Sequence, residues 1–147
     1  MDIEYIKGNL FETEHKVIVH GCNAMGRMGS GVARIVNNDF NEAYQAYRSE
    51  FETTGLELGT VVWAESNGYM FANAITQDRF GHDGKNYVNY DAIRACMEEV
   101  HGYCVAHGYS HAAMPMIGAG LGGGDWEIIS NIIEVAFINV QPVVYVI

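Results

Sequence analysis

Basic residues are scarce in this chain. Its 147 residues hold 8 Lys and Arg against 18 Asp and Glu, which gives a formal net charge of −10. Proteins that track the phosphates of a duplex present a broad basic surface, so this composition argues against an extended nucleic-acid surface. One small anionic ligand remains compatible with the charge, because backbone N–H groups can bind phosphate without Lys or Arg.

Cysteine, proline and long apolar runs are also scarce. The three cysteines, together with an acidic N-terminus that lacks a signal-peptide pattern, favour reduced thiols and a cytoplasmic location. No apolar run approaches about 18 residues, the length that a membrane helix needs, so we expect no membrane contact. With two prolines and no repeat or low-complexity tract, the sequence predicts a single domain over residues 1–147 and a monomer.

A metal site is the first candidate for function, because His101, Cys104, His107 and His111 follow one another closely. Repeated steps of about three along a helix rotate the last side chain away from the first. Neither a carboxylate nor a second cysteine completes a ligand set. We therefore expect these residues to serve helix packing and a solvated helix end, and we expect neither a metal nor another cofactor.

Hydrophobic periodicity predicts strands that alternate with helices. The alternation is broken by one hairpin at Ser66–Gly68, and it predicts an α/β protein whose mixed sheet is covered on both faces, a three-layer α/β/α sandwich. Strands are expected at residues 3–7, 17–22, 60–65, 69–75, 111–117 and 143–147. Helices are expected from residue 31, along the apolar stripe 40–51, from residue 90 to near Gly108, and after residue 125.

Two glycine-rich loops carry the strongest functional signal. Residues 23–30 and 118–124 each follow a buried strand and precede a helix. Ligands of open α/β sheets bind beyond the carboxyl ends of the strands, where helix N-termini offer unpaired N–H groups to anions. The second loop has five glycines in seven positions, and side chains there would hold the backbone away from a phosphate. A flexible turn is the alternative, and the pattern favours ligand binding.

The spacing of Gly118, Gly120 and Gly123 also matches the dinucleotide fingerprint. That fingerprint requires a complete βαβ unit and an acidic residue about 20 positions further on, at the end of the second strand. Only one predicted helix and one predicted strand follow Gly123, and no acid lies in or after that strand. The sequence therefore still predicts that this loop binds phosphate, but it does not predict the dinucleotide-binding fold.

The first loop is preceded by side chains that can act on a ligand. His20 can exchange protons near neutral pH, and the amide of Asn23 can bind sugar hydroxyls. A histidine at the end of a buried strand is often a satisfied core residue, and the residues alone leave both interpretations of His20 open. Residues 78–89 are polar and carry reactive side chains, but their composition favours a solvated loop.

Four motifs occur along the chain in this order: Ile6–Leu10, His20–Asn23, Arg27–Ala33, and Pro115–Leu121 followed by Asp125–Glu127. Together they resemble the macro domain family, and the resemblance covers nearly the whole chain. It is closest to the small branch that includes the yeast ADP-ribose-1″-phosphate phosphatase and the human terminal ADP-ribose protein glycohydrolase, and small phage-encoded proteins share the pattern. The resemblance implies a macro domain fold, ADP-ribose or a derivative as the ligand, and ADP-ribosylated protein as a further partner.

The resemblance also implies where parts of the ligand lie. Adenine would lie near Asn9 and Leu10, the diphosphate between the two glycine loops, and the distal ribose at Asn23. The family most often has Asp at the position of Asn9, whose neutral amide offers a weaker contact. The ligand-binding residues implied in this way are Asn9, Leu10, Cys22, Asn23, Met28, Gly29, Ser30, Gly31, Val32, Gly118, Ala119, Gly120, Leu121, Gly122 and Gly123.

The implied catalytic residues depend on the relative chosen. The glycohydrolase has a lysine after an Ile-Thr pair and an aspartate after Gly-x-Gly-Leu, where this chain has Gln77 and Gly122. The lysine mechanism is therefore not expected here, and Asp125 is expected to cap a helix rather than to replace the aspartate.

A histidine of the phosphatase matches His20, which implies that His20 and Asn23 are catalytic. The expected reaction is metal-independent removal of the terminal phosphate of ADP-ribose-1″-phosphate. Two alternatives stay open: a non-catalytic reader of ADP-ribose, and a hydrolase that removes ADP-ribose from macromolecules without the lysine.

Overall fold

The helices and strands of the chain alternate as the sequence predicts. The computed structural model describes residues 1–81, 83, 85–120 and 122–147. The helices among them are α1 (Gly31–Asp39), α2 (Asn41–Thr53), α3 (Tyr90–His107), α4 (Trp126–Ala136) and the short 3₁₀ helix η1 (Leu10–Glu12). The strands are β1 (Glu4–Lys7), β2 (Val17–Asn23), β3 (Val61–Ser66), β4 (Tyr69–Gln77), β5 (His111–Met114) and β6 (Gln141–Val146).

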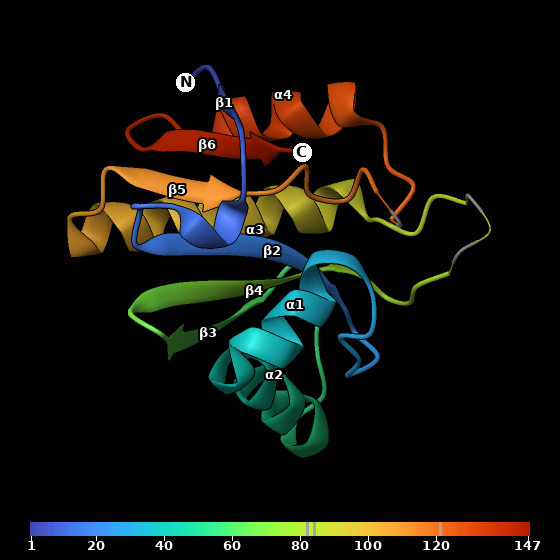
Figure 1. The fold of residues 1–147 in the computed structure, drawn as a ribbon. Coiled ribbons are helices and arrows are strands. Elements are labelled where there is room, and N and C mark those ends of the chain that lie inside the picture. The colour runs from blue at the N-terminus through green and yellow to red at the C-terminus, as the bar shows by residue number, and fades with distance from the viewer. Residues whose placement is uncertain (82, 84, 121) are drawn as a thin grey trace.

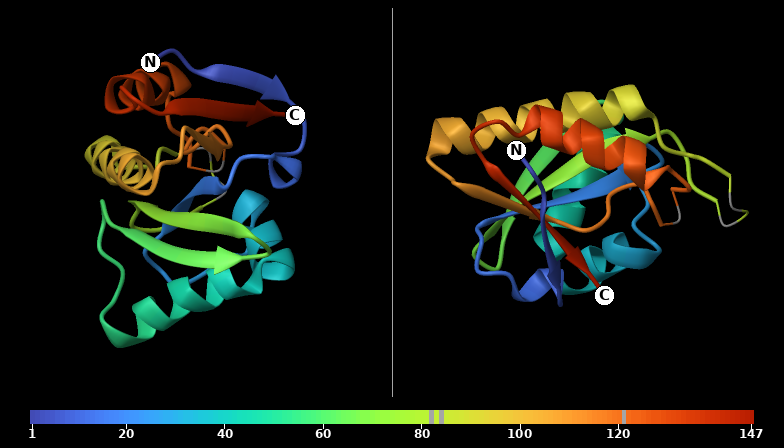
Figure 2. Two further views of the ribbon diagram at one scale, coloured as in Figure 1. Left: turned by 90° about the vertical axis from the view of Figure 1, so that its left-hand side faces the viewer. Right: turned by 90° about the horizontal axis from the view of Figure 1, so that it is seen from above.

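The strands of the described residues form one six-stranded sheet in the order β1-β6-β5-β2-β4-β3. Neighbouring strands are parallel except β3 and β4, which pair antiparallel as the predicted hairpin. Asn67 (φ 52°) and Gly68 (φ 83°) take up the positive φ angles that a tight hairpin turn requires. The sheet lies between two layers of helices (Figures 1 and 2), so the predicted three-layer α/β/α sandwich is confirmed.

Hydrophobic side chains pack on both faces of the sheet. Helices α3 and α4 cover one core, which contains Val19 and Ile133, and α1 and α2 cover the other, which contains Ile18, Val36 and Tyr47. Ile18 and Val19 are consecutive in β2 and point to opposite faces, as the alternation of a strand requires. β2 is therefore buried on both sides, which explains its continuous apolar sequence.

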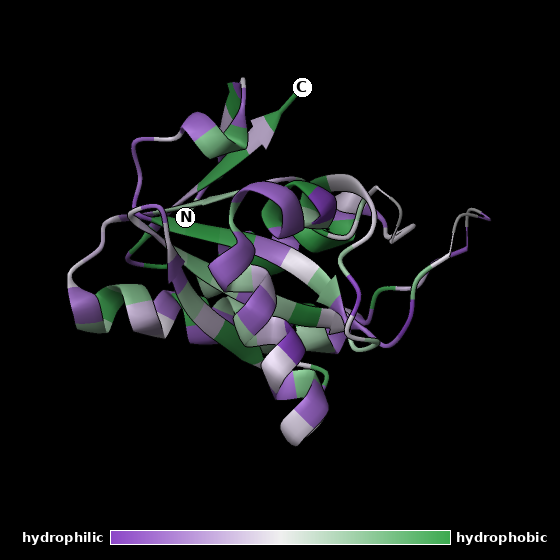
Figure 3. Ribbon diagram, turned by 60° about the horizontal axis from the view of Figure 1, so that its bottom comes forward, coloured by the Kyte–Doolittle hydropathy of each residue, from purple (hydrophilic) through white to green (hydrophobic). Residues whose placement is uncertain are grey.

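The hydropathy of the ribbon follows this layering. The central strands are largely hydrophobic in Figure 3, whereas α2 mixes hydrophilic and hydrophobic residues along its length because only one of its faces meets the sheet. None of the described helices combines the length and the hydrophobicity that crossing a membrane requires.

Strand β5 ends earlier than the sequence predicted. We expected a strand to residue 117, but β5 stops at Met114. Pro115 has no N–H to donate to the sheet, and Ile117 N donates a hydrogen bond to Pro115 O (2.8 Å), which turns the chain away from the ladder. The three residues that follow β5 are thus released into the loop region at the carboxyl end of the sheet.

Candidate functional site

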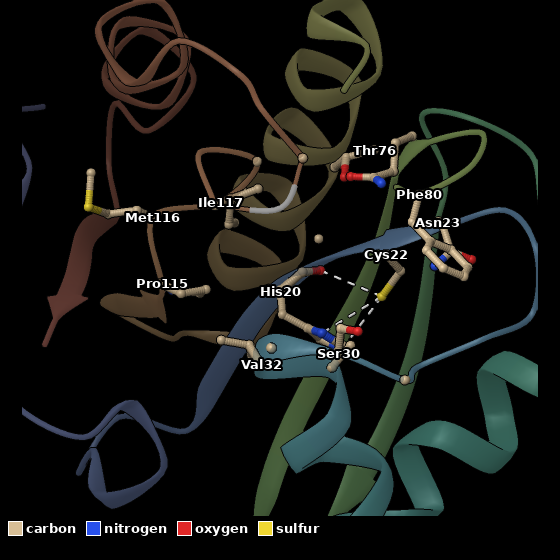
Figure 4. Close-up of a pocket in the computed structure, with 18 of the residues that line it drawn as sticks. His20, Cys22, Asn23, Ser30, Val32, Thr76, Phe80, Pro115, Met116 and Ile117 are labelled. Carbon is tan, nitrogen blue, oxygen red and sulfur yellow. Dashed lines mark hydrogen bonds between the residues drawn. The ribbon is translucent and has the colours of Figure 1, made fainter. Parts of the chain in front are cut away.

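A pocket of about 340 Å³ opens at the carboxyl ends of β2, β4 and β5. Figure 4 shows Cys22 and Asn23 of β2, Ser30 and Val32 at the start of α1, and the residues 115–117 around it. This is the edge of the sheet where the two glycine loops were expected to meet. The residues lining the pocket are His20, Gly21, Cys22, Asn23, Arg27, Gly29, Ser30, Gly31, Val32, Ala33, Thr76, Gln77, Phe80, Pro115, Met116, Ile117, Gly118, Gly120 and Gly122.

Asn23 organises the first glycine loop. Its Nδ2 donates to Arg27 O (2.9 Å), and its Oδ1 accepts from Met25 N (2.9 Å). The hydroxyl of Tyr47, which reaches over from α2, lies 2.6 Å from Asn23 O and 2.9 Å from Asn23 Oδ1. A carboxamide has two N–H donors, so one N–H of Asn23 remains for a ligand. Asn23 therefore lines the pocket as expected, and most of its hydrogen bonds shape the loop.

His20 lies at the floor of the pocket and is almost completely buried, with 1% of its surface exposed. Its Nε2 is 2.6 Å from Asn73 Oδ1, and Asn73 Nδ2 donates to Ala43 O (3.1 Å). This second bond fixes the orientation of the Asn73 amide, so Nε2 of His20 is the donor and its Nδ1 carries the lone pair. Burial lowers the pKa of His20 to about 4, so the ring is neutral at neutral pH.

Cys22 adjoins the His20 ring. Its Sγ lies 3.6 Å from Nε2 and 3.8 Å from Nδ1 of His20, and 3% of the residue is exposed. Burial raises the pKa of the Cys22 thiol well above its usual value, and the neutral imidazole offers no positive charge to stabilise a thiolate. Cys22 is thus a protonated thiol in the pocket wall and not an activated nucleophile.

The second glycine loop folds back on itself. Gly124 N donates to Gly118 O (2.8 Å), and Gly122 O accepts from Tyr87 N (2.6 Å). A Cβ on Gly122 would lie 2.8 Å from Gly118 O, and a Cβ on Gly123 would overlap Lys85 O. The glycines are required because two backbone segments cross at contact distance here.

The start of α1 faces the pocket without a side-chain cap. Ser30 is the N-cap residue, its hydroxyl makes no capping hydrogen bond, and it lines the pocket with Gly31 and Val32. The first N–H groups of a helix have no partner within the helix and favour an anion. Among the described pocket residues Arg27 is the one charged side chain at neutral pH, so the lining suits an anionic ligand.

The structure brings most of the expected ligand residues together. His20, Cys22, Asn23, the residues 29–32, Gly118, Gly120 and Gly122 line the pocket. Asn9, Leu10, Met28, Ala119 and Gly123 are not among the residues that line it, and Leu121 lies outside the described residues. Asn9 Oδ1 accepts a hydrogen bond from Phe11 N (3.0 Å) and so caps η1, while Leu10 and Met28 are buried.

Other pocket residues escaped the sequence reasoning. Thr76 lies next to the last residue of β4, Phe80 comes from the segment that was expected to be a solvated loop, and Pro115–Ile117 were assigned to a strand. Only their position in the sequence could have identified them, because each lies at or just after the carboxyl end of a strand, at the same edge of the sheet as the glycine loops. Within that segment His82 and Gly84 lie outside the described residues, and Tyr87 donates to Asp83 Oδ1 (2.8 Å).

The side chains that briefly suggested a metal site do not converge. His101 Nε2 accepts from Asn139 N (3.1 Å), the ring of His107 stacks on Tyr103, and Cys104 is buried in the core. In the described part of the chain, no group of three or more His, Cys, Asp and Glu side chains is placed to hold a metal ion.

Comparison with known proteins gives a family match and similar proteins. The family model described as Macro domain matches residues 19–133. The ADP-ribose glycohydrolase OARD1 of Bos taurus is 29% identical over 136 residues, which cover 92% of this chain and 84% of that protein. The ADP-ribose 1″-phosphate phosphatase of Candida albicans is 27% identical over 157 residues, and the match covers 99% of each chain.

A solved structure extends the similarity to the fold. A protein of unknown function from Bacteroides thetaiotaomicron is 34% identical to this chain and superposes with a TM-score of 0.86. The match covers 99% of this chain and 98% of that chain. The sheet and its helices are therefore shared from end to end.

Proposed function

The chain belongs to the macro domain family, and on that premise we propose that it binds ADP-ribose or a derivative in the pocket between its two glycine loops. The uncapped start of α1 and the backbone of the second loop would hold the diphosphate. The remaining N–H of Asn23 would meet the distal ribose. The observation that carries this proposal is a pocket whose charged lining, among the described residues, consists of Arg27 alone.

We further propose that the bound derivative is ADP-ribose-1″-phosphate and that the protein hydrolyses its terminal phosphate. The relative from Candida albicans that carries this activity in its name supports this choice. Water attacks the phosphorus, the bond between phosphorus and the ribose oxygen breaks, and the water supplies one proton to that oxygen and its hydroxyl to the phosphate. Backbone N–H groups at the start of α1 would stabilise the phosphoryl oxygens.

In this proposal we give His20 an orienting role. Because the pKa of His20 is about 4, its ring is neutral at neutral pH and is not an acid there, so the proposed reaction includes no proton donation from His20 to the leaving oxygen. The Nδ1 lone pair can accept a hydrogen bond from the attacking water, because Nε2 is already engaged with Asn73. His20 would therefore hold the water and leave the net transfer of protons to water and phosphate.

A non-catalytic reader of ADP-ribose is the second candidate. It is favoured by the pocket lining, in which no described residue is Asp, Glu or Lys, so His20 is the one side chain of a common general-base type there. Gln77 and Gly122 lie side by side, since Gln77 Oε1 would be 3.1 Å from a Cβ on Gly122. The two positions thus adjoin in the pocket without supplying a nucleophile and an acid.

Two measurements separate these functions. Isothermal titration calorimetry with ADP-ribose tests binding, and we expect a single site. Phosphate release from ADP-ribose-1″-phosphate, compared between the native protein and His20→Gln, tests the reaction. We expect native turnover that falls at least about tenfold in the variant. Binding without any phosphate release would support the reader, and equal rates would remove His20 from the reaction.

A third outcome is release of ADP-ribose from a modified macromolecule. The relative named as an ADP-ribose glycohydrolase makes this worth measuring with labelled ADP-ribosylated protein. Turnover of that substrate without phosphate release would replace the phosphatase proposal.

A further inference from the structure

One residue that lines the pocket carries a buried hydroxyl without a hydrogen-bond partner in the protein. Thr76 is the next-to-last residue of β4 and is 0% exposed. Of the buried side-chain nitrogen and oxygen atoms in the described part of the chain, Thr76 Oγ1 alone has no hydrogen-bond partner. Buried polar atoms in native proteins are nearly always paired, so an exception at a pocket wall points to a partner that arrives with the ligand.

Neither the backbone hydrogen bonding nor the packing around Thr76 requires a hydroxyl on its side chain. Thr76 O already accepts a hydrogen bond from Asn89 N (2.8 Å), which joins β4 to the start of α3. The side chain faces the same side of the sheet as Ala72 and Ala74, which belong to the apolar core under α3. A valine of the same shape would suit that surrounding better, because it would bury no unpaired oxygen.

The space beside the hydroxyl is kept open by a glycine. A Cβ on Gly21 would lie 2.9 Å from Thr76 Oγ1 and 3.3 Å from Ile117 Cγ2. The φ angle of Gly21 is not in the positive range, so its backbone does not call for glycine. Gly21, Thr76 and Ile117 all line the pocket, and the missing side chain at Gly21 leaves room beside the Thr76 hydroxyl, which is itself fully buried in the unliganded protein.

Three other polar side chains that line the pocket each make at least one hydrogen bond within the protein. His20 Nε2 bonds Asn73, and Asn23 holds the loop around Arg27. Gln77 Nε2 donates to Arg79 O (2.6 Å). Thr76 Oγ1 differs from these groups because its whole hydrogen-bonding capacity is unused.

We propose that the Thr76 hydroxyl is a ligand-binding group, which hydrogen-bonds a ribose or phosphoryl oxygen of the bound ADP-ribose derivative, and that Gly21 preserves the space for this contact. The inference rests on the proposed ligand. It assigns the part of the pocket beside Thr76 and Gly21 to an oxygen-bearing part of that ligand. The protein itself supplies Thr76 Oγ1 with no partner, so a ligand oxygen would provide one.

The test is the substitution Thr76→Val, read out in two ways. Calorimetry with ADP-ribose should show affinity weakened by about three- to tenfold, the value of one neutral hydrogen bond. The melting temperature of the unliganded variant should stay the same or rise by about 2–4 °C, because an unpaired buried hydroxyl is removed. Thr76→Ser keeps the hydroxyl and should keep the affinity.

Thr13→Val is the matched control. Thr13 is also buried, but its Oγ1 accepts from His15 N (3.2 Å) and from the Tyr145 hydroxyl (2.8 Å), and it does not line the pocket. The same chemical change there should lower the melting temperature, because it leaves two donors, His15 N and the Tyr145 hydroxyl, without their acceptor.

The outcomes separate the inference from the proposed function. A native protein that binds no ADP-ribose overturns both. Native binding that Thr76→Val leaves unchanged overturns the role of Thr76 alone. A melting temperature that falls in Thr76→Val as far as in Thr13→Val would show a hydroxyl paired within the protein, and would overturn it as well. Weakened binding with an unlowered melting temperature, restored in Thr76→Ser, supports it.

Discussion

Burial decides what individual residues of the pocket can do. His20 is a titratable side chain by type, but desolvation keeps it neutral, and the bond to Asn73, which by itself raises the pKa, offsets this only in part. Cys22 is a nucleophile by type and a protonated thiol in place. At this scale, chemistry follows from environment more than from residue identity.

The lowered pKa of His20 predicts a pH dependence of stability. The ring has a pKa of about 4 when folded against an ordinary value of 6.5, so the unfolded chain binds more protons between these values. The stability that neutral His20 contributes is present above pH 6.5 and is lost as the pH falls through about 4. This contribution is on the order of 3 kcal/mol.

We therefore expect the unfolding free energy of the native protein to fall more steeply towards acid than that of His20→Gln. Urea unfolding at a series of pH values checks this. His15, whose pKa is also lowered by burial, is present in both proteins and cancels in the difference. Parallel profiles for the two proteins would show that His20 is not held neutral by the fold.

The sequence predicted where His20 lies and could not predict its state. Strand and loop patterns depend on neighbours in the chain, and they located the pocket correctly. Asn73, which fixes the His20 ring, is 53 residues away and reaches it only through the pairing of β2 with β4. The unpaired hydroxyl of Thr76 was hidden for the same reason, because partners and their absence depend on tertiary packing.

At the scale of elements, the pocket depends on how helices and strands end. Strand β5 stops at Pro115, and the three residues that leave the sheet become pocket wall. Helix α1 begins without a side-chain cap and faces the pocket, whereas Asp125 caps α4 through its bond to Glu127 N (2.9 Å). The end that would bind an anion is thus left open, and the other is closed by the protein itself.

This difference predicts the behaviour of Asp125 variants. Asp125→Ala should lower the unfolding free energy by about 1 kcal/mol, the usual value of a lost N-cap, and Asp125→Asn should retain it because asparagine caps equally well. Phosphate release should survive in Asp125→Asn, since Asp125 does not line the pocket. Loss of turnover in a normally stable Asp125→Asn would instead identify Asp125 as an acid of the reaction.

Hydrophobic periodicity predicted which segments form helices and strands, but it predicted the ends of these elements less accurately. The stripe of Phe40, Tyr44, Tyr47 and Phe51 correctly predicted the helix that packs on the sheet. The strand prediction over 111–117 failed at a proline, where hydrogen bonding overrules an apolar run. The ends matter most here, because the site is built from them.

Over the whole molecule, the acidic charge is kept away from the pocket loops. Residues 15–38 carry Lys16, Arg27 and Arg34 and no acid, and residues 111–124 carry no charged side chain. The net charge of −10 therefore arises elsewhere in the chain. An anionic ligand meets repulsion at long range and backbone donors at short range.

The salt dependence of binding follows from this distribution. Between about 0.01 M and about 0.15 M salt the screening length falls from about 30 Å to about 8 Å, so the long-range repulsion is removed while contacts inside the pocket persist. We expect ADP-ribose affinity to rise modestly, by up to about threefold, over this range. In proteins that hold phosphates on a basic surface, affinity falls as salt rises.

Calorimetry at several salt concentrations measures this dependence. In Arg27→Gln the affinity should rise more steeply with salt, because the variant lacks the one attractive charge at the pocket. Affinity that falls steeply with salt would mean that side-chain charges, and not backbone amides, hold the ligand.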